Sequence, residues 1–285
     1  MTVLGTVEIG GTKTDVAFGT SPDDLSPPFR IATTDPGETL AAVASYFAAN
    51  PVDALGVAAF GPLDLTPSSP RYGSILATPK PGWSGLPLQE RLRSAIDVPI
   101  AIDTDVNGAA LGEGRWGAAQ GMSNYAYVTV GTGIGAGIVV AGHLLAGERH
   151  PEMGHIPVRR LDGDTFAGNC PYHGDCLEGM AAGPSLEARF GPPGTWAGNE
   201  IVVGHVAHYL AQGVLALAYV AAPERVVIGG GVASLPWLHD RVRSKLVEMM
   251  GGYPEEPDPD LLVSAPGLGG LSGLAGGLVL AETAV

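Results

Sequence analysis

One pattern occurs twice in the chain: an apolar strand, a turn rich in glycine and threonine, and a second strand. The first copy, "EIGGTKTDVAF", begins at Glu8, and the second, "TVGTGIGAGIVV", begins at Thr129, roughly 120 residues further on. Two halves that each offer such a turn can clamp one polyphosphate from opposite sides of a cleft, because converging backbone N–H groups bind anions. The repeat therefore predicts a two-part protein with a phosphate-bearing ligand.

The first turn, "GGTK", has two interpretations. A plain hairpin turn explains Gly10 and Gly11, since glycine adopts the positive φ of tight turns, but it leaves Lys13 unexplained. A phosphate loop gives every residue a role, because Thr12 adds a hydroxyl and Lys13 an ammonium group to the N–H groups of the glycines. It is not a Walker motif, since G-x-x-x-x-G-K-[ST] is absent and no helix is expected to begin here.

Two further glycine clusters follow strand-like runs. Gly131, Thr132 and Gly133 form the second turn, and Gly229, Gly230 and Gly231 follow the apolar run "RVVI". Glycine at such places lets a phosphate or a flat ring approach the backbone. Each cluster alone is typical of an ordinary turn, but three in this order favour a ligand that has both chemical groups.

Length and charge restrict the class of protein. The chain has 285 residues, which favours two domains of medium size. Lysine and arginine number 15 against 29 acidic residues, and the net charge of −14 predicts no nucleic-acid partner and no anionic membrane. The N-terminal stretch lacks the basic region of a secretory signal, so a cytoplasmic location is expected. The apolar stretch 124–147 has a strand period and is interpreted as a buried hairpin.

Alternating strand and helix patterns predict an α/β protein. Strands are expected at Val3–Ile9, Asp15–Gly19, Ala54–Ala59, Ile100–Asp103, Ala126–Val130, Ala136–Val140 and Arg225–Ile228. Helices are expected at Gly37–Ala49, Leu86–Ala95, Asn107–Gly114, Asn199–Ala221 and Leu235–Met250.

Two carboxylates, Asp103 and Asp105, lie where a strand gives way to a helix. One of them is expected to cap the helix, because an aspartate side chain accepts hydrogen bonds from the first N–H groups. The other interpretation is that Asp105 projects into a cleft as a general base, which takes a hydroxyl proton while that oxygen attacks a γ-phosphate. Asn107 would then orient the loop or the substrate.

Two imidazoles and two thiols follow in a short segment. His155, Cys170, His173 and Cys176 supply a complete set of four ligands for a tetrahedral zinc ion, three of them in a Cys-x-x-His-x-x-Cys spacing. A full set suits a structural site rather than a hydrolytic one. The alternatives are a strained Cys170–Cys176 disulfide or histidines that only lie on the surface. His150, His205, His208 and His239 have no such neighbours and are interpreted as ordinary surface or helix-face histidines.

Two glutamates flank the proposed metal loop. Glu152 lies three residues before His155, and Glu178 lies two residues after Cys176. As isolated acids they would be solvated. If a metal ion fixes the loop, these carboxylates become rigid acceptors for sugar hydroxyls.

Taken together, these segments resemble the ROK family of sugar kinases, and within it the fructokinase-like branch. "EIGGTKTDVAFG" and "GTGIGAG" are similar to the two phosphate hairpins of the family, and "FGPLD" is similar to its sugar-side loop. "DTDVNGAALGE" resembles its catalytic-aspartate segment, "EMGH" with "CPYHGDCLEG" its zinc and sugar segment, and "VVIGGGV" its adenosine-side glycines. The resemblance spans almost the whole chain.

The resemblance implies a two-domain, actin-like (ribonuclease H-like) ATPase fold with a cleft between the domains. The expected smaller domain is 1–117 plus 273–285, and the larger is 118–272 with the zinc loop. ATP, Mg²⁺ and Zn²⁺ are the implied cofactors, and Asp105 is the implied base toward the 6-hydroxyl of a hexose. The implied phosphate and nucleotide contacts are Gly10, Gly11, Thr12, Lys13, Gly131, Thr132, Gly133, Gly229 and Gly230. The implied sugar contacts are Gly61, Thr104, Asn107, Glu152, His155 and Glu178.

The chain departs from many members of the family at a few places. They have aspartate in place of Glu8, asparagine in place of Thr104, and three cysteines with one histidine at the zinc loop. These differences match the fructokinase branch, so D-fructose is the expected acceptor. A glucokinase, an N-acetylmannosamine kinase and a sugar-sensing protein without catalysis stay as alternatives, and a homodimer is left open. No helix-turn-helix is expected before Val3, unlike the repressors of the family.

Overall fold

A computed structural model describes residues 2–253 and 255–285, which fall into two compact units. The first unit holds the chain up to Gly121 together with Leu145–His150 and Gly270–Val285. The second unit holds Met122–Leu144 and Pro151–Gly269. The expected domain limits differ from these units by a few residues and do not include the excursion 145–150. That the two parts fold as separate domains stays a prediction.

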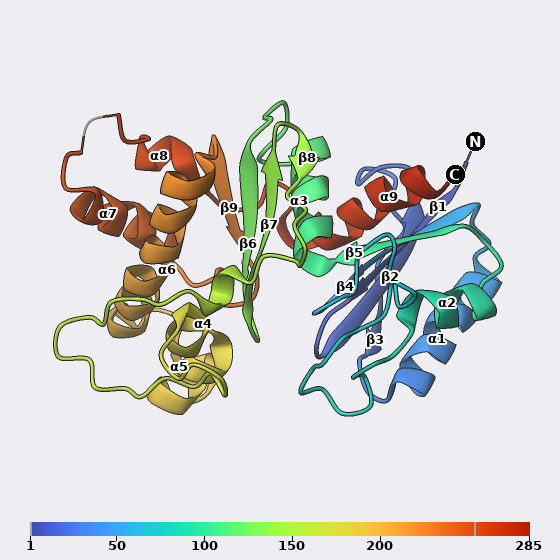
Figure 1. Ribbon diagram of the computed structural model, residues 1–285, viewed down its shortest axis with the longest axis horizontal. Coiled ribbons are helices and arrows are strands. Elements are labelled where there is room, and N and C mark those ends of the chain that lie inside the picture. Colours follow the sequence, from blue (N-terminus) through green and yellow to red (C-terminus); the bar gives the residue numbers. More distant parts are fainter. Residues whose placement is uncertain (1, 254) are drawn as a thin grey trace. The chain divides into compact units, whose positions relative to one another are not determined.

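The first unit is built on a sheet of five strands (Figure 1). The strands are β1 (Leu4–Ile9), β2 (Lys13–Gly19), β3 (Phe29–Ala32), β4 (Ala54–Ala59) and β5 (Ile100–Thr104). Their order is β3-β2-β1-β4-β5. Strand β1 is antiparallel to β2 and parallel to β4, which is parallel to β5. The chain therefore leaves β1, β4 and β5 at the same edge of the sheet.

The second unit repeats this topology. Its strands are β6 (Tyr125–Val130), β7 (Ile134–Val140), β8 (His143–Leu144), β9 (Arg225–Gly229) and β10 (Val263–Ser264), in the order β10-β9-β6-β7-β8. Strand β6 is antiparallel to β7 and parallel to β9, as β1 is to β2 and β4. The repeat in the sequence is thus a repeat of a five-stranded sheet that begins with a hairpin. The buried hairpin expected within 124–147 is confirmed.

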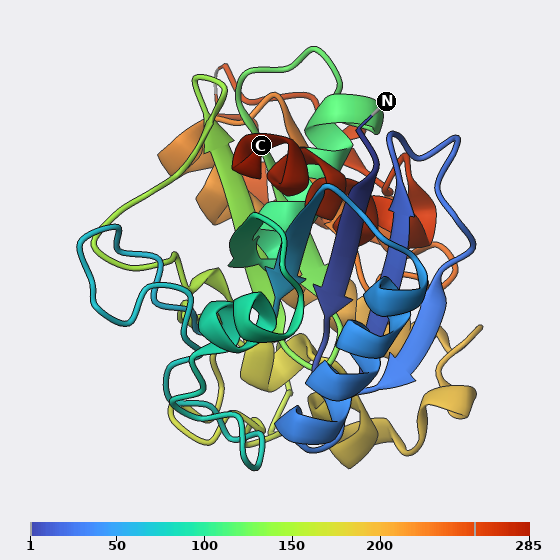
Figure 2. The same ribbon diagram turned by 90° about the vertical axis from the view of Figure 1, so that its right-hand side faces the viewer.

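Helices cover both faces of the first sheet. On one face lie α1 (Pro36–Ala49) and α2 (Leu88–Ala95), which Figure 2 shows in front of the strands. They pack on alternate residues of the strands, such as Val7 and Val57. On the other face lie α3 (Asp105–Trp116) and the C-terminal α9 (Ser272–Ala284), which contact each other and meet at an angle in Figure 1.

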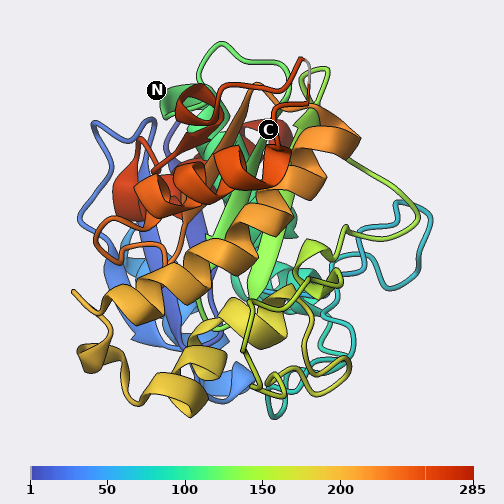
Figure 3. The ribbon, with the colours of Figure 1, turned by 90° about the vertical axis from the view of Figure 1, so that its left-hand side faces the viewer.

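In the second unit, the long helix α6 (Glu200–Ala221) packs on the sheet and beside α7 (Leu238–Met250), as Figure 3 shows. The short helices are α4 (Leu177–Ala181), α5 (Gly183–Phe190) and α8 (Pro259–Leu262), and 3-10 turns lie at Met153–His155, Pro193–Thr195 and Gly269–Leu271. Among the described helices only α6 is long and apolar enough to cross a membrane, and 56% of its apolar window is buried in the protein. Val206 and Leu210 of α6 lie in the core, so we interpret α6 as a core helix.

All seven expected strands and all five expected helices are present, with ends that differ by a few residues. The sequence did not predict the short strands β3, β8 and β10, the short helices α4, α5 and α8, or α9. The last omission has a physical reason. Helix α9 is rich in glycine, which is a poor helix former, and only its packing against the rest of the unit makes it helical.

The packing of α9 requires those glycines. A Cβ atom on Gly276 would overlap the backbone carbonyl of Gly108 in α3, and one on Gly56 in β4 would overlap the carbonyl of Gly277. Two helices and a strand therefore approach each other backbone to backbone. This close approach fixes the position of α3 on the sheet.

We predict that Gly276→Ala destabilises the protein by about 1–3 kcal/mol, because the new methyl group must push α3 and α9 apart. Urea unfolding followed by circular dichroism measures the effect. Gly204→Ala in α6 is the matched control, because a Cβ there meets no atom within 4 Å. It should stabilise the protein by about 0.5–1 kcal/mol through helix propensity alone. A Gly276→Ala variant as stable as the wild type would contradict the packing.

Candidate functional site

The candidate functional residues of the first unit gather where its parallel strands end. Ile9, Ala59 and Thr104 are register partners at the last positions of β1, β4 and β5. The segments that follow them contain the Gly10 turn, Gly61 and Asp105, so the topology brings these three sequence motifs to one edge of the sheet. In parallel sheets this edge is where ligands usually bind.

The turn between β1 and β2 is closed by its own backbone. The N–H of Gly10 donates to the carbonyl of Lys13 at 2.8 Å, and the carbonyl of Thr12 accepts from Thr33 N at 3.1 Å. Neither Gly10 nor Gly11 has a left-handed φ, so the expectation of positive φ is wrong. The space beside Gly11 is open, since a Cβ there would meet nothing within 4 Å. An open side on the turn leaves room for a ligand to approach the backbone.

Two lysines lie at this turn, and the sequence pointed to one of them. Lys13 Nζ is 3.1 Å from Asp15 Oδ2, and its side chain is half exposed. Lys80 was missed: its Nζ donates to the carbonyls of Gly11 at 2.6 Å and Thr33 at 2.9 Å. Lys80 lies in a long loop rich in proline and glycine, and a lysine within "TPKPGW" was the only available signal. It anchors the outside of the turn.

The start of α3 holds its side chains by a local network. Thr104 is the N-cap, with Oγ1 accepting from Asn107 N at 3.2 Å, so the expectation that one of the two aspartates caps the helix is wrong. Asp103 Oδ1 accepts from Thr104 N and from Asn107 Nδ2, each at 2.7 Å. Asp105 is the first residue of the helix, and its Oδ1 accepts from the neighbouring Val106 N at 2.9 Å.

Burial sets the protonation of two carboxyl groups in this unit. It raises the pKa of Asp105 to about 6, against the opposing effect of the backbone N–H of Val106. Burial also raises the pKa of Glu8 to about 7, with Lys13 opposing and the charge of Asp105 adding to the shift. Glu8 lies against α9, where a Cβ on Gly273 would be 2.5 Å from its Oε2. Asp105 is therefore largely ionised at neutral pH, yet basic enough to accept a proton.

The second unit presents the second turn in a similar way. Gly131 N donates to the carbonyl of Gly133 at 2.9 Å, and the carbonyl of Gly131 accepts from Gly183 N at 2.7 Å. Glu178 Oε2 accepts from Ile134 N at 3.0 Å, and a Cβ on Gly133 would lie only 2.7 Å from that oxygen. One carboxylate oxygen of Glu178 thus supports the turn between β6 and β7.

The third glycine cluster lies beside the second turn. Val232 N donates to the carbonyl of Val130, the last residue of β6, at 2.9 Å. Gly230 has φ +94°, and a Cβ on it would be 2.5 Å from the same carbonyl oxygen. No larger residue fits there without moving the chain. The structure therefore brings together the two glycine clusters that the sequence places roughly 100 residues apart.

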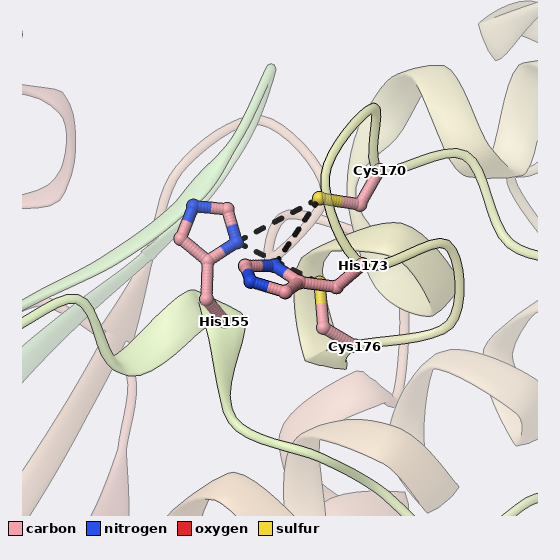
Figure 4. Close-up of side chains that lie close together, drawn as sticks. All are labelled: His155, Cys170, His173 and Cys176. Atoms are coloured by element: carbon pink, nitrogen blue, oxygen red, sulfur yellow. Dashed lines mark hydrogen bonds between the residues drawn. The ribbon is translucent and has the colours of Figure 1, made fainter.

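The four expected metal ligands converge in the second unit (Figure 4). Their ligand atoms all lie within 4.8 Å of one another. His155 Nδ1 is 3.8 Å from Cys170 Sγ and 3.6 Å from Cys176 Sγ, and His173 Nδ1 is 3.7 Å from Cys170 Sγ. Both cysteines are free thiols, so the disulfide alternative is not borne out.

These separations fit a tetrahedral ion. Zinc bonds of about 2.3 Å to sulfur and about 2.0 Å to nitrogen put the two atoms about 3.5 Å apart in a tetrahedron. The loop that carries Cys170 and His173 has isolated bridges as its regular structure, between Cys170 and Gly174 and between Cys176 and Pro157. A metal ion would add a tie between this loop and the 3-10 turn that carries His155.

The two flanking glutamates lie on different elements of the second unit. Glu152 is exposed and immediately precedes the turn Met153–His155, while Glu178 lies in the first turn of α4, just after Cys176. His155 turns Nδ1 toward the thiols, which leaves Nε2 on the opposite side of its ring. One histidine can thus serve a metal and a second ligand at the same time.

Comparison with known proteins gives this fold a class. A glucokinase of the ROK family from Streptomyces griseus, solved in complex with glucose and AMPPNP, matches with a TM-score of 0.80 and 26% identity over 99% of both chains. The two sheets, each with a glycine-rich hairpin, define a two-domain actin-like ATPase fold.

The particular family follows from the sequence. The model of the ROK family matches residues 4–284, and the chain belongs to this family. The chain is 42% identical to a fructokinase of Pediococcus pentosaceus over 99% of both proteins. It is 39% identical to a fructokinase of Zymomonas mobilis over 99% of this chain and 97% of the relative.

We predict that the buried carboxyl of Glu8 lowers stability as the pH rises. Its pKa is about 7 in the folded chain against 4.5 as a free side chain, so the folded state holds a proton that the unfolded state has lost. Stability should therefore fall between pH 4.5 and 7, by up to about 3 kcal/mol. Glu8→Gln should gain on the wild type over this window in urea unfolding.

The exposed Glu90 on α2 provides the control for this measurement. Glu90→Gln should follow the wild type at every pH. A Glu8→Gln variant whose difference from the wild type does not change with pH would show that Glu8 titrates normally.

Proposed function

We propose that this protein is a fructokinase that transfers the γ-phosphate of ATP to the 6-hydroxyl of D-fructose. The observation that carries the proposal is Asp105, a partly buried carboxylate of raised pKa at the edge where β1, β4 and β5 end, beside the Gly10 turn of the same unit. Full-length fructokinase relatives at 42% and 39% identity support the choice of reaction and sugar.

In this mechanism Asp105 is the general base. The 6-oxygen of the sugar attacks the γ-phosphorus while its proton passes to the carboxylate of Asp105. The bond from the γ-phosphorus to the bridging oxygen breaks, and ADP leaves with that electron pair. A pKa near 6 suits this step, because the base is ionised at neutral pH and still competes for a proton as the sugar oxygen loses it.

We assign the phosphate contacts to the glycine-rich turns. In the first unit they are Gly10, Gly11, Thr12 and Lys13, whose N–H groups, hydroxyl and ammonium are all suited to an anion. In the second unit they are Gly131, Thr132 and Gly133, with Gly229 and Gly230 next to them where an adenosine group can approach the backbone. Mg²⁺ would neutralise part of the charge on the transferred phosphate.

We assign the sugar contacts to polar groups near the start of α3 and near the proposed metal loop. They are Gly61, Thr104, Asn107, Glu152, His155 and Glu178. A side chain that is already held by a hydrogen bond or a metal ion orients a polyol well, because its conformation is restricted before the sugar binds. Glu178 is held at the β6–β7 turn, Asn107 is held by Asp103, and His155 would be held by the metal.

We propose a structural zinc ion bound by His155, Cys170, His173 and Cys176. The four donor atoms converge with separations that suit a tetrahedron, and no water-accessible coordination position is needed for the reaction described above. The ion would fix the loop from which His155 and Glu178 reach the sugar. We infer a cytoplasmic location from the proposed phosphoryl-transfer role.

We predict that Asp105→Asn lowers kcat by about 10² to 10⁴, because the amide cannot accept the proton. ATP binding by calorimetry should stay within about twofold, since the phosphate turns are unchanged. A variant that keeps more than half of the activity would remove Asp105 from its role. The wild-type kcat/KM should also rise with pH through about 6, and this rise should be lost in the residual activity of the variant.

We predict about one zinc ion per chain in protein purified without chelator. Cys170→Ser and Cys176→Ser should each lose the metal and lower Tm by roughly 5–10 °C, with a loss of activity. His143→Ser is the control, because His143 is exposed on β8 and lies outside the cluster. Metal-free wild-type protein with full activity and an unchanged Tm would contradict the zinc site.

We predict that D-fructose is the best acceptor. A coupled ADP-release assay should compare kcat/KM for fructose, glucose, mannose and N-acetylmannosamine under one set of conditions. Groups built to hydrogen-bond one sugar reject another by leaving polar groups unpaired, so the preference should be large, roughly 10² or more. If glucose equals or exceeds fructose, the protein is a glucokinase of the same fold and Asp105 keeps its role.

A further inference from the structure

His150 lies next to the start of α3, which carries Asp105, although its sequence position gave no reason to expect it there. It ends the excursion 145–150, which packs with the first unit rather than with the strands that precede it. Its Nε2 is 3.1 Å from Thr104 Oγ1 and 3.4 Å from Asn107 Oδ1. These two residues flank Asp105 in the first turn of α3.

The surrounding bonds determine which atom carries the proton. Asn107 Nδ2 donates to Asp103 Oδ1 at 2.7 Å, so the amide is oriented with its Oδ1 toward the imidazole. An amide oxygen can only accept a hydrogen bond. His150 Nε2 must therefore be protonated, and it is a donor toward both Asn107 Oδ1 and Thr104 Oγ1.

The Nε2–H of His150 restricts the hydrogen bonds that Thr104 can make with a ligand. Its Oγ1 already accepts from Asn107 N at 3.2 Å, and the imidazole supplies a second donor at 3.1 Å. A hydroxyl has two acceptor lone pairs and one proton. With both lone pairs engaged, Thr104 can only donate its proton to a ligand.

We propose that His150 is a specificity-determining positioning residue, which makes Thr104 an obligate hydrogen-bond donor toward the sugar. The sugar selected is one that presents an acceptor oxygen to Thr104 while its 6-hydroxyl contacts Asp105. A sugar that places no oxygen within hydrogen-bond distance of Thr104 in that pose loses the contact, because a donor needs an acceptor oxygen. This inference rests on the proposed hexose kinase function and adds a residue to it.

The test is a comparison of His150→Leu with His150→Gln. Leucine removes the donor, so we expect kcat/KM for fructose relative to glucose to fall about 10-fold, mainly through KM for fructose. The KM for ATP should stay within about twofold. Glutamine places an amide N–H near the position of Nε2, so it should recover most of the ratio.

A double-mutant cycle identifies the route of the effect. Thr104→Val removes the hydroxyl, and if His150 acts through it, Thr104→Val/His150→Leu should be no less selective than Thr104→Val alone. His143→Leu, which removes an exposed imidazole from β8, is the control and should match the wild type. If His150→Leu does not fold, His150→Asn replaces it, since its shorter amide does not reach the Nε2 position.

An unchanged sugar ratio in a folded His150→Leu variant would overturn the proposal, and so would additive losses in the cycle. Failure of the broader function is a separate result, because it would be seen in the wild type as no ATP-dependent phosphorylation of any hexose. If the wild type prefers another hexose, the same ratio is measured between its best and second-best sugars, and the same outcomes decide.

Discussion

The backbone contact between α3 and α9 is the constraint on which the proposed catalytic part of the first unit depends. Gly108 of α3 and Gly276 of α9 meet with no side chain between them, and Gly277 meets Gly56 of β4 in the same way. Because α3 begins with Asp105, this packing sets where the carboxylate lies at the edge of the sheet. Helix α9 also leaves space for the side chain of Glu8, which lies against Gly273. Glycines that carry no reactive group thus position the proposed base.

Burial makes the carboxylate of Asp105 a stronger base. A solvent-exposed aspartate is too weak a base to assist a sugar hydroxyl, but loss of solvation brings the pKa of Asp105 to about 6. The neighbouring Glu8 is shifted further, to about 7, so the two carboxyl groups need not carry full charge together. Closely packed carboxylates in an acidic protein would otherwise repel one another and the phosphates of a nucleotide.

Local patterns allowed much of the site to be predicted from the sequence. The two hairpins, the strand that leads to Asp105 and the four candidate metal ligands each lie within a short segment of the chain, so a local pattern points to each of them. Helix α9 was missed because its glycines are unfavourable in an isolated helix, and only contacts with distant residues explain them. Lys80 and His150 were missed for the same reason. Lys80 bonds to Gly11, and His150 bonds to Thr104, across long stretches of chain that no local pattern encodes.

The central claim is that the protein transfers the γ-phosphate of ATP to the 6-hydroxyl of D-fructose, and the position of the phosphate in the product tests this most directly. The wild-type protein should be incubated with ATP, magnesium and ¹³C-labelled D-fructose, and the product followed by ¹³C and ³¹P NMR. The account predicts phosphorus coupling to the carbon at position 6 and a stoichiometric appearance of ADP. Coupling to the carbon at position 1, or no sugar phosphate at all, would contradict it.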